Sequence, residues 1–257
     1  KPRDVKNVVV DGFVYTEDTL RANIRDNQKV RLNTCLDVIF DDKKINMLEV
    51  GVYRGNLIAS ILARPSGARV YAVEPNPEVV HEVKKRFTTD VSFYNVGLGN
   101  KSGEGILYVT EHTGYSSQFE PNPAGSHSKR IYNGKLGSDG FEVVKKIPFE
   151  IIEGDKFLNG IGVKSIDFMS LNTQGTEYQI LEGLKNFLSS GRIKTILVEN
   201  DLENRYLGAK DDFAEQQALL RDNGFQLFDI VLIRELLPVG IRRLYPLYVH
   251  ESLASRP

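Results

Sequence analysis

The 257-residue sequence predicts an α/β fold of the Rossmann-like type, with a mostly parallel seven-stranded sheet, helices on both faces and an antiparallel C-terminal strand. Three observations predict it. Apolar runs of strand length alternate with helical patterns along most of the chain. The first run enters a glycine turn at Gly51 and Gly55, and the second ends in the acidic residue Glu74. Near the C-terminus, Phe225 to Val231 and Leu244 to His250 suit a closing antiparallel pair.

The composition sets bounds on domains and partners. We expect an N-terminal helical extension over residues 1–44 and one domain over residues 45–257, with a lid-like insertion at about 111–140. Lys and Arg total 33 against 34 for Asp and Glu, so no net field attracts nucleic acid or an anionic membrane. One cysteine and no apolar run of 18 residues favour a cytoplasmic protein. A homo-oligomer stays open.

The first half of the chain begins with a helical pattern from Thr16 to Phe40, where Thr16 can cap and Leu32 and Leu36 share one face. A strand, a helix, a strand, a helix and a third strand are expected next. Their bounds are Ile45 to Val50, Gly55 to Ala63, Arg69 to Glu74, from Pro77 onwards, and Val91 to Val96.

The alternation then pauses, because a strand-like run from Ile106 to Thr110 replaces the expected helix. Residues 111–140 are rich in Gly, Ser, Asn and Pro, and a loop of this length inside a compact domain is usually functional or disordered. We interpret it as an active-site lid. The later elements are expected at Ile147 to Ile151, Ser165 to Leu171, Glu177 to Leu188 (a helix), Ile193 to Glu199 and Asp211 to Asn223 (a helix).

The turn after the first strand predicts a nucleoside cofactor. Gly51 permits close backbone approach, and Gly55 lets the next helix pack tightly on the strand. Glu74, at the tip of the second strand, is placed to accept hydrogen bonds from ribose hydroxyls. Tyr53 and Pro75 flank these positions and join the predicted cofactor site.

The acid at the start of this turn narrows the cofactor. Glu49 stands where dinucleotide enzymes place a pyrophosphate against a helix N-terminus. Its carboxylate would repel a pyrophosphate but attract the ammonium group of S-adenosyl-L-methionine. By the rule that ligands bind beyond the carboxyl ends of parallel strands, one cleft should be rimmed by residues 49–55, 74–76, 95–97, 172–177 and 199–200.

The stretch from Ile166 to Gly183 has a more specific pattern. It resembles the FkbM family of S-adenosylmethionine-dependent methyltransferases at Asp167, Gly175, Glu177, Leu181 and Gly183, and Tyr115-Ser116-Ser117 resembles the Ser-Ser segment of that family. The resemblance covers Ile45 to Glu199. It implies a class I methyltransferase fold and an oxygen acceptor, often on a sugar or specialised metabolite, with Val96 and Gly97 near the adenine.

The chain departs from the family pattern at Ser170-Leu171-Asn172, where Lys-x-Asp is typical. An amide cannot serve as a general base and is a weak ligand for a hard cation, so Asn172 is predicted to orient a substrate hydroxyl and contact the cofactor, and no metal is predicted. Glu177 is a catalytic candidate, with a helix-dipole role as the alternative. Of the lid histidines His112 and His127, we name His127 as the candidate base.

These observations favour O-methylation of a small-molecule, sugar or glycan hydroxyl with S-adenosyl-L-methionine. Asn172 is followed by Thr-Gln-Gly and not by Pro-Pro-Tyr/Phe, which weakens methylation of a base nitrogen. Two alternatives stay open: an NAD-dependent oxidoreductase, to which a strand-turn-helix with a downstream acid also gives support, and a methyltransferase-like protein that binds the cofactor without catalysis.

Overall fold

The computed structural model describes residues 7–10, 13–16, 31–41, 43–87, 89–125, 131–132, 135–136, 140–210, 213–236 and 240–253. The chain divides into two compact units, Lys1–Asp42 and Lys43–Pro257. In the first unit, β1 (Asn7–Val10) and β2 (Phe13–Thr16) form an antiparallel hairpin that the sequence analysis did not predict. Residues 31–40 are helical, as predicted, whereas the expected helical stretch 17–30 lies outside the described residues.

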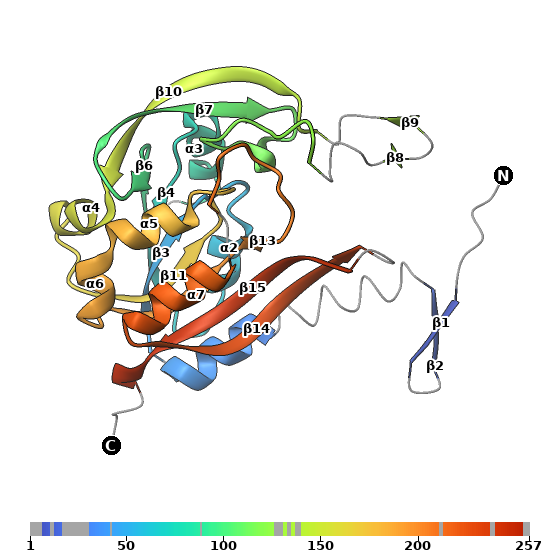
Figure 1. The fold of residues 1–257 in the computed structure, drawn as a ribbon. Coiled ribbons are helices and arrows are strands. Elements are labelled where there is room, and N and C mark those ends of the chain that lie inside the picture. The colour runs from blue at the N-terminus through green and yellow to red at the C-terminus, as the bar shows by residue number, and fades with distance from the viewer. Residues whose placement is uncertain are drawn as a thin grey trace. The chain divides into compact units, whose positions relative to one another are not determined.

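The second unit is built on the expected mostly parallel sheet (Figure 1). Five strands run parallel in the order β5 (Val91–Tyr94), β4 (Ala68–Val73), β3 (Ile45–Val50), β11 (Ile166–Leu171) and β12 (Ile193–Val198). The C-terminal strand β15 (Gly240–His250) pairs antiparallel with β12 and with β14 (Phe225–Leu236). The described part of this sheet has eight strands and not seven, because the two-residue strand β13 (Asn200–Asp201) continues β12 along β15.

The strand order reverses at β3, which lies between β4 and β11. The chain moves outward from β3 to β4 and β5 on one side, and later from β11 to β12 on the other. A crevice beyond the carboxyl ends of parallel strands forms at such a point. The fold therefore brings the loops after β3, β4 and β11 together.

Helices cover both faces of the sheet (Figure 1), and most begin and end near their predicted bounds. They are α2 (Asn56–Leu62), α3 (Pro77–Lys84), α4 (Gly154–Gly160), α5 (Glu177–Gly183), α6 (Lys185–Ser189) and α7 (Phe213–Asp222). The predicted single helix Glu177 to Leu188 is wrong, because it breaks between Gly183 and Leu184. Gly183 packs so closely on β6 (Gly97–Gly99) that a Cβ atom there would lie 1.9 Å from the Gly99 oxygen.

A second, three-stranded sheet interrupts the alternation where the sequence pattern paused. Its order is β6, β10 (Val143–Glu153), β7 (Gly103–Thr110), with β10 antiparallel to β7 and parallel to β6. The predicted strands 106–110 and 147–151 belong to it. The ring of Phe149 packs over Gly97 and Gly105, where a Cβ atom would lie within 3 Å of it.

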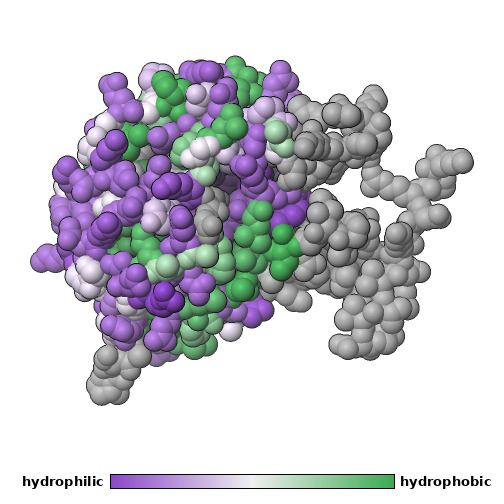
Figure 2. Space-filling model, in the orientation of Figure 1, coloured by the Kyte–Doolittle hydropathy of each residue, from purple (hydrophilic) through white to green (hydrophobic). Residues whose placement is uncertain are grey.

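The main hydrophobic core lies between the central strands and the helices after β10 and β11. On the face shown in Figure 2, hydrophobic residues gather over β14 and β15, where Leu227, Phe228 and Ile241 are exposed. Across the described residues, no helix is both long and apolar enough to span a lipid bilayer.

Candidate active site

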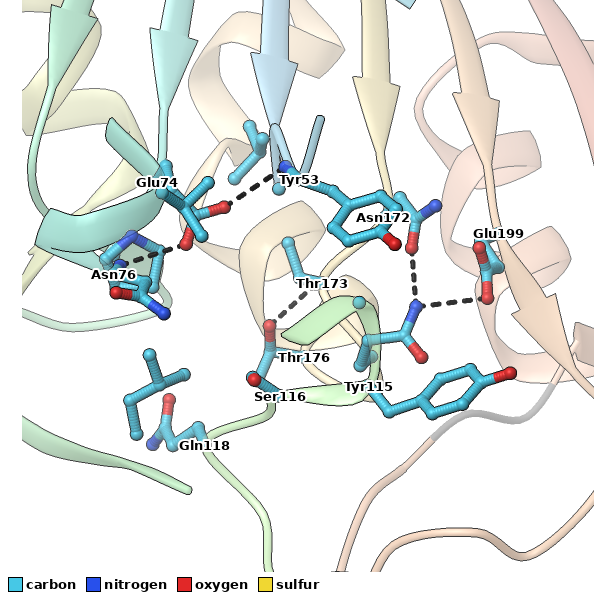
Figure 3. A pocket seen from close by; sticks show the side chains of 18 of the residues that line it. Tyr53, Glu74, Asn76, Tyr115, Ser116, Gln118, Asn172, Thr173, Thr176 and Glu199 are labelled. Carbon is cyan, nitrogen blue, oxygen red and sulfur yellow. Dashed lines mark hydrogen bonds between the residues drawn. The ribbon is translucent and has the colours of Figure 1, made fainter. Parts of the chain in front are cut away.

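A cavity of about 300 Å³ opens at the reversal point of the sheet. Figure 3 shows Glu74 and Asn76 on one side of it and Asn172 and Glu199 on the other. The turn after β3, the loops after β4, β11 and β12, strand β15 and the segment 112–118 all contribute to its wall. The lining residues are Val50, Gly51, Tyr53, Glu74, Pro75, Asn76, Val79, Gly97, Leu98, Leu107, His112, Thr113, Gly114, Tyr115, Ser116, Gln118, Phe149, Asn172, Thr173, Gln174, Thr176, Ile180, Glu199, Arg243 and Tyr245.

Gly51 is held between the two strands that flank β3. Its N–H donates to the Val73 oxygen (3.0 Å), and its φ of 88° lies in the left-handed region that favours glycine. A Cβ atom at Gly51 would lie 1.9 Å from the backbone oxygen of Asn172. Gly51 therefore brings the β3 turn against the β11 loop, as the predicted close approach requires.

Gly55 is the N-cap residue of α2, also with a positive φ of 66°. The side chains nearest to an added Cβ are Val83 and Phe87, at 2.7 and 3.0 Å. Gly55 thus packs against the end of α3 and not against the strand, which corrects the expected contact. It does not line the cavity.

Glu74 lines the cavity with its carboxylate held by backbone amides. Oε2 accepts from the N–H groups of Val52 (3.1 Å) and Tyr53 (3.5 Å), and Oε1 accepts from that of Asn76 (2.9 Å). Burial raises the pKa of Glu74, although these three hydrogen bonds act in the opposite direction. A carboxylate offers about four lone-pair positions, so the group retains capacity for a ligand hydroxyl.

Glu49 lies immediately before the lining residues Val50 and Gly51 but does not itself line the cavity. It is 4% exposed, and its Oε2 atom has no hydrogen-bond partner among the described residues. Burial, and then the nearby charge of Glu74, raise the pKa of Glu49 well above its usual range. A bound cation would offset the free-energy cost of burying this oxygen without a partner. The residues present therefore fit an ammonium-bearing cofactor.

Gln174 connects three parts of the cavity wall. Its Nε2 atom donates to Asn172 Oδ1 (2.6 Å) and to Glu199 Oε1 (3.1 Å), as Figure 3 shows for the two acceptors. Its Oε1 atom accepts from Tyr206 Oη (3.0 Å) and Arg205 Nη2 (3.3 Å). A carboxylate on one side and a guanidinium on the other leave one orientation for this amide.

The buried carboxylate of Glu199 contacts a guanidinium group and a tyrosine hydroxyl. Arg243 Nη1 lies 2.8 Å from its Oε1, and Tyr245 Oη donates to its Oε2 at 2.6 Å. Burial would raise the pKa of Glu199, but Arg243 and Arg205 lower it overall. Arg205 also pairs with Asp201, so two carboxylates face two guanidinium groups in this cluster.

Glu177 does not line the cavity. Its carboxylate turns back over the loop before α5, where Oε1 accepts from the N–H of Thr173 (2.5 Å) and Oε2 from that of Gly175 (2.8 Å). The residue is 1% exposed, and burial raises its pKa. This geometry fits the alternative role at the start of a helix, in which Glu177 shapes the loop that carries Asn172 and Gln174.

The segment after β7 forms an aromatic wall. The rings of His112 and Tyr115 stack at 4.5 Å between centroids, and Tyr115 stacks on Phe141 at 4.3 Å. Tyr53 Oη lies 3.3 Å from His112 Nε2. The candidate base His127 lies outside the described residues, whereas His112 is at the cavity.

This wall is fastened to the rest of the domain. Ser117 Oγ donates to the Gln174 backbone oxygen (2.7 Å), and Tyr206 Oη, whose one proton is shared with Gln174 Oε1, lies 2.9 Å from the Tyr115 backbone oxygen. The Asn122 N–H donates to the oxygen of Arg205 (2.7 Å). Hydrogen bonds along residues 115–122 therefore hold in place the part of this segment that lines the cavity.

Six of the predicted site residues line the cavity: Gly51, Tyr53, Glu74, Pro75, Gly97 and Asn172. Val96 does not. Sequence reasoning missed Phe149, Arg243 and Tyr245 as lining residues, whereas Gln174 belongs to the predicted rim 172–177 but was not named as a site residue. Gln174 lies within the segment that resembles the FkbM family, so the sequence could have identified it. Phe149 and the β15 residues come from strands with no recognisable motif. Within the described part of the chain, no group of three or more His, Cys, Asp or Glu side chains is arranged to hold a metal ion.

Comparison with known proteins gives one sequence match. Residues 49–227 match the model of the methyltransferase FkbM domain. No curated protein matches the chain.

Similar solved structures include precorrin-6y C5,15-methyltransferase from Geobacter metallireducens (11% identity, TM-score 0.44, 86% of this chain and 87% of that one). Magnesium protoporphyrin IX methyltransferase from Synechocystis PCC 6803, with bound S-adenosylmethionine, has 11% identity and a TM-score of 0.44 over 96% of this chain and 88% of that one. A Methanococcus jannaschii fibrillarin, a pre-rRNA processing protein, has 14% identity and a TM-score of 0.46 over 97% and 84%. All three similarities are distant.

Proposed function

The chain belongs to the methyltransferase FkbM domain family and is an S-adenosylmethionine-dependent methyltransferase, and on that basis we propose that it methylates a hydroxyl oxygen of a small molecule, sugar or glycan. Because the chain belongs to this family, we no longer propose the NAD-dependent oxidoreductase that the sequence alone left open. The observation behind the oxygen acceptor is that His112, paired with Tyr53, lines the same cavity as the oriented amide of Asn172.

The cofactor is proposed to lie along the turn after β3. Glu49 would face the methionine ammonium, Glu74 would accept from the ribose, and Gly97 would border the adenine with the apolar side chains of Leu98 and Phe149. Gly51, which lines the cavity, would border the methionine part. When bound, S-adenosylmethionine supplies a methyl group activated by a sulfonium.

Asn172 is proposed to present a hydrogen-bond donor to the acceptor. Because Gln174 can only turn its NH₂ group toward Glu199, the Asn172 oxygen must face Gln174 and its own NH₂ group is turned away from it. Among the described residues, Asn172 Nδ2 makes no hydrogen bond. It is free to donate to a lone pair of the acceptor hydroxyl and so orient it.

His112 is proposed to take the proton of that hydroxyl in place of His127. A hydroxyl carries a high-pKa proton, so a base helps when its oxygen attacks. The His112 imidazole would accept the hydroxyl proton while the acceptor oxygen takes the methyl group of S-adenosylmethionine, whose sulfur would keep the bonding pair as the leaving group. Tyr53 and Tyr115 hold the imidazole ring by hydrogen bonding and stacking.

The charged groups around Glu199 favour an uncharged acceptor. Glu199 is already paired with Arg243, and Asp201 with Arg205, so the arginines are committed to carboxylates of the protein. An anionic substrate would have to compete for them. The stacked rings of His112 and Tyr115 offer a flat surface that suits a sugar or another hydroxylated ring.

Methyl transfer from labelled S-adenosylmethionine to a panel of uncharged hydroxylated compounds tests the proposal. An O-methyl product whose formation falls about 100-fold or more in His112→Ala would support it, and methylation of nitrogen or carbon would contradict it. Cytoplasmic location, self-association and the lack of nucleic-acid or membrane partners stay predictions.

A further inference from the structure

We propose that Asn76 is a further cofactor-binding residue, whose side-chain amide donates a hydrogen bond to a ribose hydroxyl of S-adenosylmethionine. The inference deepens the proposed cofactor placement and rests on the ribose role of Glu74. It does not depend on the identity of the methyl acceptor. Asn76 lines the cavity directly beside Glu74, as Figure 3 shows.

The orientation of the Asn76 amide follows from helix capping. Asn76 is the N-cap residue of α3, and its Oδ1 atom accepts from the backbone N–H of Glu78 at 3.0 Å. Only an oxygen can accept this bond, so Oδ1 is committed to the helix. The NH₂ group therefore occupies the other position of the amide.

That NH₂ group is buried without a partner. Asn76 is 2% exposed, and Nδ2 has no hydrogen-bond partner among the described residues. A buried unsatisfied donor costs free energy that a ligand atom can recover. The capping role explains the oxygen of this side chain but leaves the nitrogen unexplained.

The neighbouring carboxylate indicates which ligand atom the nitrogen meets. The backbone N–H of Asn76 donates to Glu74 Oε1 at 2.9 Å, so the two side chains are fixed close together. Glu74, when ionised, can only accept, and Asn76 Nδ2 can only donate. A hydroxyl does both, and a vicinal diol can donate to Glu74 while accepting from Asn76. A ribose offers this pair.

An adenine nitrogen is the competing partner, since it also accepts hydrogen bonds. Among the lining residues near Gly97, however, Leu98, Leu107 and Phe149 are apolar, which suits the faces of a base. Asn76 is tied to Glu74 by a backbone hydrogen bond. The contact with the ribose therefore follows more directly from the geometry.

The test uses calorimetry with S-adenosylhomocysteine and its 2′-deoxy and 3′-deoxy analogues. Asn76→Ser keeps a capping oxygen and removes the amide donor, so Tm should stay within about 3 °C of wild type. Its affinity for S-adenosylhomocysteine should fall about tenfold. For the analogue that lacks the contacted hydroxyl, the same substitution should change affinity by less than threefold.

Asn76→Asp is the matched variant, because aspartate caps a helix as well as asparagine but cannot donate. It should weaken S-adenosylhomocysteine binding at least as much as Asn76→Ser. Unchanged affinity in both variants would overturn the proposal. An equal loss for all three ligands would also overturn it, because it would place the contact on the adenine. Failure of O-methylation would leave these binding results unaffected.

Discussion

Gln174 Nε2 lies 3.1 Å from Glu199 Oε1, and this contact sets the direction of two amides. Arg205 and Tyr206 hold the other end of Gln174, so its NH₂ group also faces Asn172 Oδ1. The amide of Asn172 must then turn its NH₂ group away from Gln174. A pair of buried charges outside the reacting centre thus determines whether that position donates or accepts.

Asn172→Asp should lower kcat/KM for the acceptor by about 10- to 100-fold, because it replaces a donor with a charged acceptor of similar size. Steady-state kinetics at saturating S-adenosylmethionine measures this. Gln174→Ala should cause a smaller loss, since the Asn172 amide stays in place but is free to turn. Wild-type kinetics for Asn172→Asp would rule out the donor role.

His112→Ala should reduce kcat by about 100-fold or more, the range found for a lost general base. Single-turnover kinetics at saturating S-adenosylmethionine and acceptor measures this. Tyr53→Phe serves as the control, since it keeps the ring but loses the hydroxyl near Nε2. A His112→Ala rate close to that of the wild type would show that another group is the base.

Gly51→Ala should destabilise the protein by about 4 kcal/mol or more, because its Cβ would overlap the Asn172 backbone oxygen. Chemical denaturation measures the change. Gly67→Ala is the matched control: Gly67 also has a positive φ, of 68°, but nothing lies within 4 Å of its Cβ, so about 1 kcal/mol is expected. Similar losses in both variants would show that backbone strain alone sets the cost.

Glu49→Gln should stabilise the cofactor-free protein at pH 7 and weaken its affinity for S-adenosylmethionine. The pKa of Glu49 is raised in the folded state, so folding takes up a proton, and the stability of the wild type should increase as pH falls from the raised pKa toward 4.5. The variant lacks this contribution, although Glu74 still gives one of the same sign. Thermal unfolding between pH 4.5 and 8 measures the stability of the variant and the pH dependence of the wild type. Each kcal/mol of stability should change Tm by about 3 °C. A variant less stable than wild type at pH 7 would contradict the assigned burial cost.

The bounds of the elements from β3 to α3 were predictable because the local sequence signals there all favour the same structure. The apolar run ending in Glu49, the glycines and the Asn76-Pro77 helix start each agree with the observed bounds. Their spacing also predicted that Glu74 lies beside the β3 turn. Reversal of the strand order then followed from alternating strands and helices.

The rest depended on contacts between residues far apart in the sequence. The side chains of Arg243 and Tyr245 reach Glu199 only because β15 pairs with β12, a relationship that no local pattern encodes. Glu177 was named as catalytic from its position, whereas its carboxylate is committed to two backbone amides. The choice of His127 over His112 had no structural basis in the sequence, because a loop without periodicity gives no direction to its side chains.

Methyl transfer from isotopically labelled S-adenosylmethionine, with the product bond located by nuclear magnetic resonance, tests the central claim most directly. With an uncharged hydroxylated acceptor, we expect one O-methyl group and one S-adenosylhomocysteine per turnover, and at least a 100-fold slower rate in His112→Ala. A methyl group on nitrogen, sulfur or carbon would contradict the proposed function. So would cofactor binding without transfer to any hydroxyl in a broad panel.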